Sequence, residues 1–223
     1  AQAWAQNDES TERTSTPPDA ATGAQERVVF ADETLILAWE ASNPGERVKE
    51  YIPAGEKLES WTRLASIREY DELDDVPALV GSFVRVLKER YPKSPVKVFE
   101  SQASGEAMIE FLVWPGDGAL EDAPFVEYNI FKYSKRAEGG CVAQQYALRA
   151  YDNFETFLTE LDAQKKGLLE EMSTQGLQLQ SAEEAAAGDN TEEAQDVEAQ
   201  NNAESSEADG ATGEEPRDEV ADE

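Results

Sequence analysis

The side chains best suited to chemistry in this sequence are five residues that it predicts to gather on or beside one face of a sheet. They are Trp61, Glu127, Asn129, Gln145 and Arg149. Because successive strand residues point to opposite faces, the last four would share the sheet face opposite the helices, turned away from the apolar residues between them. Two interpretations stay open: a solvated face with cross-strand Glu–Arg pairing, or a shallow groove for a small or extended ligand. In the second, Arg149 would receive a ligand carboxylate.

Trp61 follows the turn at residues 53–55 and heads a predicted strand over residues 62–70. The structural interpretation is that its ring fills one edge of the core where the chain turns into this strand. The alternative is an aromatic platform on which a ligand stacks.

Paired carboxylates offer a route to hydrolysis without histidine. Glu110 and Glu127 are predicted to be neighbours on adjacent strands, on the same polar face. A second acidic group, Asp71 to Asp75, lacks the spacing of an EF-hand loop. We therefore expect acids at a helix N-terminus there, and we expect no metal and no cofactor.

The residue types that are missing exclude several site chemistries. The chain has no histidine and one cysteine, Cys141, so it cannot build a Ser-His-Asp triad, an intrachain disulfide or a multi-cysteine metal site. A catalytic cysteine needs a base to activate it, so Cys141 is predicted to be a half-buried structural thiol. Intermolecular pairing of this thiol stays an alternative. No phosphate-binding loop and no dinucleotide fingerprint occurs in the sequence.

Charge divides the 223 residues into three parts. Residues 1–24 form a polar arm with a charge of −3, and residues 176–223 form a tail in which sixteen acids and one base give −15. Both are too poor in apolar side chains to offset their ordering entropy, so both are predicted to be disordered. The domain between them, residues 25–175, keeps −11 of the total −29.

This acidity excludes binding to nucleic acid phosphates and to anionic lipid. The tail would keep the protein soluble, or alternatively dock a basic partner. The stretch AQAWAQ at residues 1–6 resembles the end of a bacterial secretory signal, so we expect a periplasmic or secreted protein. No apolar run reaches the length of a transmembrane segment.

Hydrophobic periodicity predicts an α+β domain. Strands are expected at residues 34–41, 47–53, 62–70, 94–101, 106–115, 124–135 and 141–151, and amphipathic helices at 75–91 and 154–172. Asp74 or Asp75 would cap the first helix, with Pro77 in its first turn. Four strands lie between the helices with connections too short for crossovers, so they should form an antiparallel meander. The predicted architecture is a sheet of about six to seven strands with both helices on one face.

Residues 53–64, PAGEKLESWTRL, resemble a pattern in small exported bacterial proteins of unassigned function, where a Pro/Gly turn and a polar run precede W-T and a strand. At the level of fold, the predicted layout is similar to PsbP/Mog1-like domains. That similarity implies a binding or accessory module, and no functional residue of that group matches a position in this chain.

The function that these features favour is an exported accessory or binding protein without catalytic activity, whose partner is an unknown protein or small ligand. Two alternatives remain: a carboxylate-based hydrolase that uses Glu110 and Glu127, and an interaction protein that acts through its acidic tail.

Overall fold

A single antiparallel sheet of nine strands dominates the part of the chain that the structure describes. In this computed structural model the described residues are 25–101, 103–115, 120 and 123–181. The strands are β1 (Arg27–Phe30), β2 (Glu33–Asn43), β3 (Glu46–Ile52), β4 (Arg63–Tyr70), β5 (Val96–Ser101), β6 (Glu106–Val113), β7 (Val126–Lys135), β8 (Cys141–Ala150) and β9 (Gln178–Gln180).

The strands follow the order β5-β6-β7-β8-β4-β3-β2-β1-β9 across the sheet. Strands β5 to β8 pair with their sequence neighbours, as the short connections between them require. Strand β4 joins this meander to the N-terminal strands by pairing with β8. Strands β7, β8 and β4 are therefore neighbours inside the sheet, and side chains from these three strands can meet on either face.

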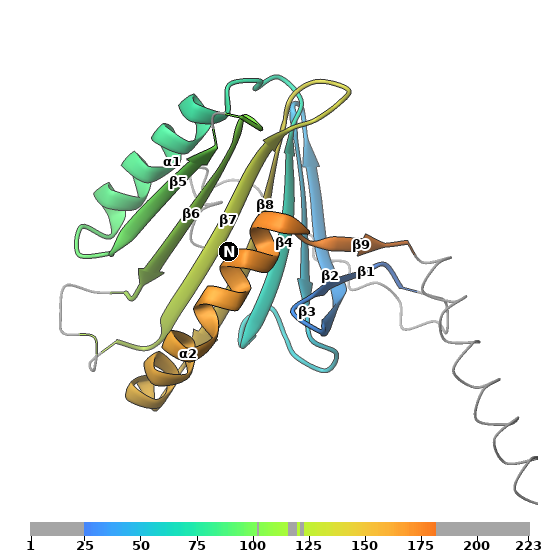
Figure 1. The fold of residues 1–223 in the computed structure, drawn as a ribbon. Helices are drawn as coiled ribbons and strands as arrows, with labels where there is room; N and C mark the ends of the chain where they lie inside the picture. The colour runs from blue at the N-terminus through green and yellow to red at the C-terminus, as the bar shows by residue number, and fades with distance from the viewer. Residues whose placement is uncertain (1–24, 102, 116–119, 121–122, 182–223) are drawn as a thin grey trace, which may run out of the picture. The chain divides into compact units, whose positions relative to one another are not determined.

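The two helices, α1 (Val76–Arg90) and α2 (Phe154–Thr174), lie on opposite faces of the sheet. Helix α1 packs over Phe131 and Tyr133 of β7, whereas α2 packs over Tyr128 and Ile130 of the same strand. Odd and even positions of a strand point to opposite sides. The prediction that both helices cover one face is therefore wrong, and Figure 1 shows α2 crossing the side of the sheet that faces the viewer.

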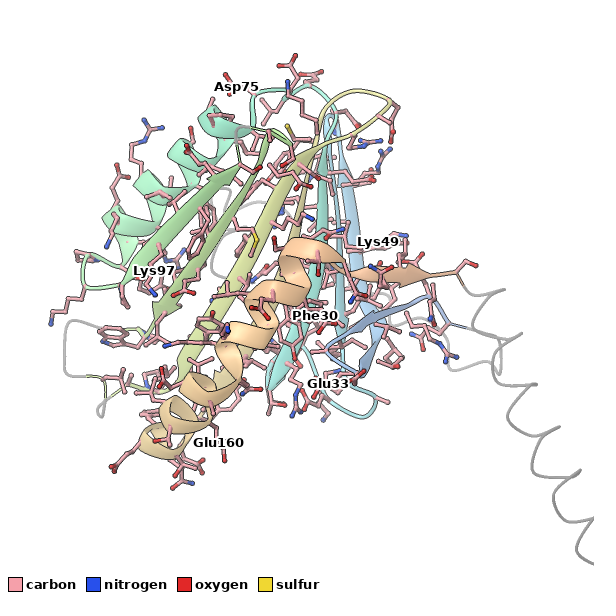
Figure 2. All side chains as sticks on the ribbon, in the orientation of Figure 1. Phe30, Glu33, Lys49, Asp75, Lys97 and Glu160 are labelled. Atoms are coloured by element: carbon pink, nitrogen blue, oxygen red, sulfur yellow. The ribbon has the colours of Figure 1, made fainter. Side chains whose placement is uncertain are left out.

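The sheet curls around α2, which lies on its concave side (Figure 1). The core under α2 collects side chains from strands that are far apart in the sheet, among them Phe30 of β1, Tyr51 of β3 and Tyr146 of β8. Figure 2 shows Phe30 beside the helix. The carboxylate of Glu171 on α2 also accepts a hydrogen bond from the backbone N–H of Ala31, at 2.7 Å. A helix inside a curved sheet can contact both of its halves, which explains this wide core.

Helix α1 begins as its sequence predicts. The Asp75 side chain accepts a hydrogen bond from the backbone N–H of Ala78 at 3.0 Å, and Pro77 lies in the first turn. Lys88 and Arg90 lie in the last turn, where they suit the negative end of the helix dipole. Val80 and Leu87 on its buried face join the core on the convex side of the sheet.

The predicted fold class, an α+β domain with six to seven strands, is wrong: the described protein is mostly β, with nine strands and only two helices. Residues 27–30 form a strand separate from β2, and residues 178–180, assigned to the acidic tail by the sequence, pair with β1 as β9. The fold thus continues past residue 175. The predicted N-terminal arm, residues 1–24, and the tail from residue 182 onward lie outside the described residues.

Candidate functional site

Four of the predicted site residues form a continuous chain of hydrogen bonds, which we call the polar row: Glu127, Asn129, Gln145 and Arg149. Both Nε and Nη2 of Arg149 donate to Oε2 of Glu127, at 3.0 and 2.5 Å. The side-chain amide of Asn129 donates to Oε1 of Glu127 at 2.9 Å, and the amide of Gln145 donates to Oδ1 of Asn129 at 2.7 Å. The structure therefore brings these four residues together, but on the face of β7 and β8 that α1 covers, so the prediction of a face opposite the helices is wrong.

Trp61, the fifth predicted residue, packs against the end of this row. The guanidinium carbon of Arg149 lies 3.8 Å from the centre of the Trp61 ring and 4.4 Å from the centre of the Phe125 ring. Trp61 itself is 1% exposed and packs with Ile52 in a small hydrophobic cluster. This burial matches the structural interpretation of Trp61, because a stacking platform for a ligand would need an open ring face.

The polar row is buried, in contrast to the solvated face that was one expectation. Glu127 is 2% exposed and Asn129 is fully buried. Burial works to raise the pKa of Glu127, whereas the charge of Arg149 and the amide of Asn129 lower it, and the result is a pKa below the usual value. Glu127 is therefore an ionised partner that already occupies Arg149, which limits the ability of Arg149 to receive a ligand carboxylate.

Glu110 does not share a face with Glu127, which corrects the paired-carboxylate hypothesis. Glu110 lies opposite Ile130 in the register of β6 and β7, on the α2 side, whereas Glu127 lies opposite Val113 on the α1 side. Lys97 pairs with Glu110 at 2.6 Å, just as Arg149 pairs with Glu127. Two carboxylates on opposite sides of a sheet cannot flank one scissile bond.

A pocket of about 220 Å³ opens beside the polar row, between α1 and the centre of the sheet. We call it the α1 pocket. Its lining consists of Ser66, Arg68 and Tyr70 from β4, Leu79, Ser82, Phe83 and Val86 from α1, Phe131 and Tyr133 from β7, and Ala143 and Gln145 from β8. Gln145 is the one predicted site residue that reaches it, so it connects the pocket to the polar row.

Three polar groups of the lining keep hydrogen-bonding capacity toward the α1 pocket. Within the described part of the chain, no hydrogen bond is made by the hydroxyls of Ser66 and Tyr133, and none is accepted by Oε1 of Gln145. All three side chains are less than 5% exposed. A few polar groups in a mostly apolar concavity are the features that orient a bound ligand, so these three oxygens mark where a ligand would form hydrogen bonds.

Sequence reasoning missed Ser66, Arg68 and Tyr133 as site residues. The signal was present in strand β4, where Ser66 and Arg68 alternate with Ala65 and Ile67, but neither face of that strand was cleanly apolar. Without knowing that β4 pairs with β8, nothing placed its polar positions beside Gln145. The pairing joins segments about eighty positions apart, and local periodicity carries no information on it.

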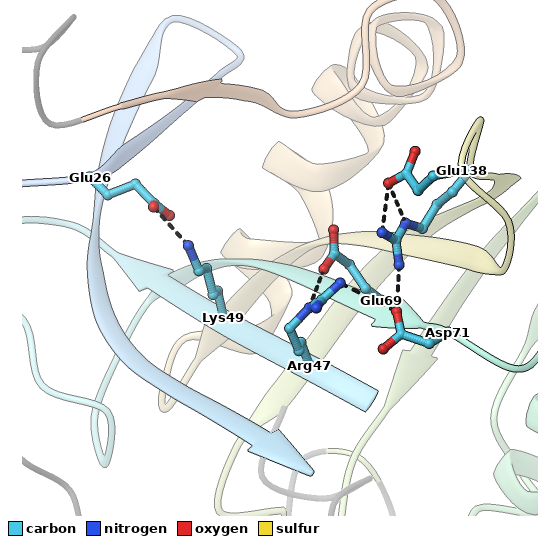
Figure 3. A network of polar contacts seen from close by, with 7 residues as sticks. Glu26, Arg47, Lys49, Glu69, Asp71 and Glu138 are labelled. Atoms are coloured by element: carbon cyan, nitrogen blue, oxygen red, sulfur yellow. Dashed lines mark hydrogen bonds and ion pairs between the residues drawn. The ribbon is translucent and has the colours of Figure 1, made fainter. Parts of the chain in front are cut away.

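The other groups singled out by the sequence have structural partners. Asp71 of the acidic group forms ion pairs with Arg136 at 2.7 Å and with Arg47 at 3.3 Å. Figure 3 draws this network around Asp71. Across the described residues, no group of His, Cys, Asp or Glu side chains is arranged to hold a metal ion. Cys141 is fully buried, more deeply than predicted, and burial raises the pKa of its thiol. A protonated, buried thiol fits the structural role.

The comparisons with known proteins add a family but no relative of known activity. No curated protein and no solved structure matches the chain, so the similarity to PsbP/Mog1-like domains stays an expectation. No helix in the described part of the chain combines the length and the apolar composition that a membrane crossing requires. A family model matches residues 22–177, from just before β1 to the end of α2 and the turn after it. The chain therefore belongs to this uncharacterised protein family.

Proposed function

We propose that this protein is a binding module without catalytic activity, and that its α1 pocket takes a small, largely apolar ligand. The observation that carries the proposal is the combination of an apolar lining with three polar oxygens that keep hydrogen-bonding capacity toward the pocket, the hydroxyls of Ser66 and Tyr133 and Oε1 of Gln145. Ligand sites are mostly apolar concavities with a few placed polar groups. The polar row then has a supporting role, since it fixes the side chain of Gln145 at the wall of the pocket.

The volume of the α1 pocket limits the size of its ligand. An apolar protein cavity of about 150 Å³ holds one benzene molecule. A pocket of about 220 Å³ therefore has room for an aromatic ring or a branched aliphatic group with a short polar extension. Long acyl chains, nucleotides and oligosaccharides exceed this volume.

Ligand-detected NMR with 3-phenylpropanamide, a neutral probe of this size, tests the proposal. We expect saturable binding to the full-length protein and its loss in Ala143→Leu, because the larger side chain fills the pocket from its floor. Ser82→Phe, at an exposed position on α1, should block the mouth with little risk to folding. Ala78→Phe, exposed on the same helix but outside the lining, is the matched control. Binding that persists in both blocked variants would refute the proposal.

Two finer parts of the function are also proposals. Export to the periplasm or medium is supported only by the resemblance of residues 1–6 to a signal end, and fractionation of host cells that express the gene tests it. An acidic tail that docks a basic partner is supported by its sixteen acids and one base. A comparison of proteins bound by the full chain and by a 1–181 truncation tests this second part, and identical partners would end it.

A further inference from the structure

Two rows of directly paired side chains, each with one residue from β7, β8 and β4, form the floor of the α1 pocket. We call each row a rung, and the two rungs differ in polarity. In the first rung, Tyr133 of β7 and Arg68 of β4 flank Ala143 of β8. In the next rung, Phe131 and Ser66 flank Gln145. Directly opposed side chains on neighbouring strands lie about 5 Å apart at Cβ. The small side chain of Ala143 thus leaves a gap between Tyr133 and Arg68, and this gap is the deepest part of the first rung.

The first rung concentrates hydrogen-bond donors. The guanidinium of Arg68 donates to Glu46 through Nη1 at 3.0 Å, which uses one of its five N–H groups. Tyr70 continues this end of the pocket along β4, and it interacts with Arg68 through their polar ends. The Tyr133 hydroxyl has no partner among the described residues. An arginine and two phenols at one end form a set of donors suited to an acceptor with two oxygens.

The charges at this end of the pocket are those of Arg68 and of Glu46, which pairs with it at 3.0 Å. Arg68 is the only lining side chain with an ordinary charge at neutral pH. Burial raises the pKa of Tyr133 well above its usual value and also raises the pKa of Tyr70, so both phenols keep their protons and can donate. The acidic residues elsewhere on the domain repel an anion only weakly, since screening limits exposed charges to about 8 Å at physiological salt. The N–H groups of Arg68 that Glu46 does not use therefore favour an anion at this end of the pocket.

The opposite wall of the pocket is apolar and aromatic. The Phe83 ring of α1 lies 5.0 Å from the Phe131 ring, centre to centre, and 6.2 Å from the Tyr133 ring. Leu79 and Val86 extend this wall along the helix, and Val86 is 48% exposed at its rim. A ligand that satisfies both ends must carry an apolar group next to an anionic one.

We infer that the ligand of the α1 pocket is an apolar monocarboxylate, whose carboxylate binds Arg68 and the Tyr133 hydroxyl while its ring or branched chain packs against Phe83 and Phe131. This inference rests on the proposed function and adds the chemical class of the ligand to it. Such a carboxylate has two sources: a free small acid, or the C-terminal apolar residue of a peptide. The role first expected for Arg149, which Glu127 occupies, thus passes to Arg68 on the neighbouring strand.

Titration calorimetry on the full-length protein tests the inference with two isosteric probes, 3-phenylpropanoate and 3-phenylpropanamide. A charge-assisted hydrogen bond predicts that the acid binds about tenfold more tightly than the amide. Arg68→Gln should remove this preference and keep binding of the amide, which also shows that the pocket is still formed. Arg68→Lys should keep part of the preference. Arg63→Gln, which makes the same change on the same strand but on the opposite face, should leave it intact.

The results separate the inference from the proposed function. Equal affinity of acid and amide for the unaltered protein, or a preference that survives Arg68→Gln, would overturn the carboxylate while leaving a neutral ligand possible. Absence of binding by either probe would overturn both. Acetyl-glycyl-phenylalanine, compared with its C-terminal amide, distinguishes the two sources: tighter binding of this peptide acid than of 3-phenylpropanoate supports a peptide C-terminus, and weaker binding supports a free acid.

Discussion

Arg149 is the residue on which the polar row depends, because it is the buried counter-ion of Glu127. Its side chain is 11% exposed and that of Glu127 is 3% exposed. The aromatic rings of Trp61 and Phe125 pack on the guanidinium and keep it from water. Loss of the cation would remove the guanidinium that holds the buried Glu127 carboxylate, and breaking a buried ion pair from one side costs more than the pair itself contributes.

We therefore predict that Arg149→Met lowers the free energy of unfolding by about 3–5 kcal/mol. Arg63→Met, which breaks the exposed pair of Arg63 with Glu33, should cost less than about 1 kcal/mol. Urea unfolding of both variants measures the difference. Restoration of part of the stability by Glu127→Gln in the Arg149→Met background would show that the charge of the Glu127 carboxylate is the cause. Similar small costs for both arginine variants would contradict the buried pair.

Glu26 gives the domain a defined response to acid. Lys49 pairs with it at 2.7 Å and the Tyr51 hydroxyl also donates to it, as the left side of Figure 3 shows for Lys49. Burial raises the pKa of Glu26, but these two partners lower it, and the net pKa in the folded protein is below the usual value. A carboxyl whose folded-state pKa is depressed contributes stability above its unfolded pKa and loses it as the pH falls through the folded pKa.

Glu26→Gln should consequently reduce the loss of melting temperature that occurs below about pH 4.5. At neutral pH the same variant should be less stable than the unaltered protein, because it lacks the ion pair. Thermal unfolding from pH 7 to pH 3 measures both effects, and Lys49→Met should flatten the acid limb in the same way. An acid limb that is as steep in Glu26→Gln as in the unaltered protein would contradict this assignment.

At the scale of elements, the tight turn between β1 and β2 carries backbone strain. Ala31 and Asp32 connect the paired residues Phe30 and Glu33, and both adopt positive φ angles, 51° and 59°. A two-residue hairpin loop of this type favours Asn and Gly, because most side chains are strained in this conformation. The turn places Ala31 against α2, where its N–H bonds to Glu171, so tertiary contacts hold a sequence that local preference disfavours.

Asp32→Gly should raise the free energy of unfolding by about 0.5–1 kcal/mol. This corresponds to an increase of about 1–4 °C in melting temperature for a domain of this size. The reciprocal control is Gly55→Ala, where φ is 85° and an added Cβ would meet no atom within 4 Å. Because the added Cβ contacts nothing, this control measures the cost of the positive φ angle alone. It should lower the free energy of unfolding by a similar amount. A neutral effect of both substitutions would contradict the strain.

Most of the individual elements could be predicted from the sequence, because their signals are local. The cap at Asp75, the helix after it and the meander of β5 to β8 all follow from residue types and short connections. Strands β1 and β9 were missed, since three or four residues are too few to show a period. Alternation grouped the four polar-row residues together, but it wrongly added Glu110 to them and placed their face opposite the helices.

Whole-molecule features were the part that the sequence could not supply. The prediction that both helices lie on one face was wrong because β6 and β7 are apolar on both sides. On β6, Ile109 and Phe111 point to α1, whereas Met108 and Leu112 point to α2. Such double-sided strands indicate a sheet that is covered twice. The α1 pocket depends on the β4–β8 pairing and on α1 together, so no local pattern could reveal it.

A two-sided core makes a prediction about Ile109 and Ile130, which are both fully buried on opposite faces of neighbouring strands. Ile→Val at either position should cost about 0.5–1.5 kcal/mol. A one-sided core would leave one of the two changes without effect. The double variant should equal the sum within about 0.5 kcal/mol, because the two side chains belong to separate clusters. Urea unfolding of the two single variants and the double variant gives these values.

The most direct test of the account is to map where a ligand binds. Addition of 3-phenylpropanoate to isotope-labelled full-length protein should shift the NMR signals of Arg68, Tyr133, Ala143 and Gln145 on the sheet and of Phe83 on α1. Signals from the α2 side, such as those of Tyr128 and Leu161, should stay in place. No shifts at saturating ligand, or shifts confined to the α2 side, would contradict the claim that the α1 pocket is the binding site.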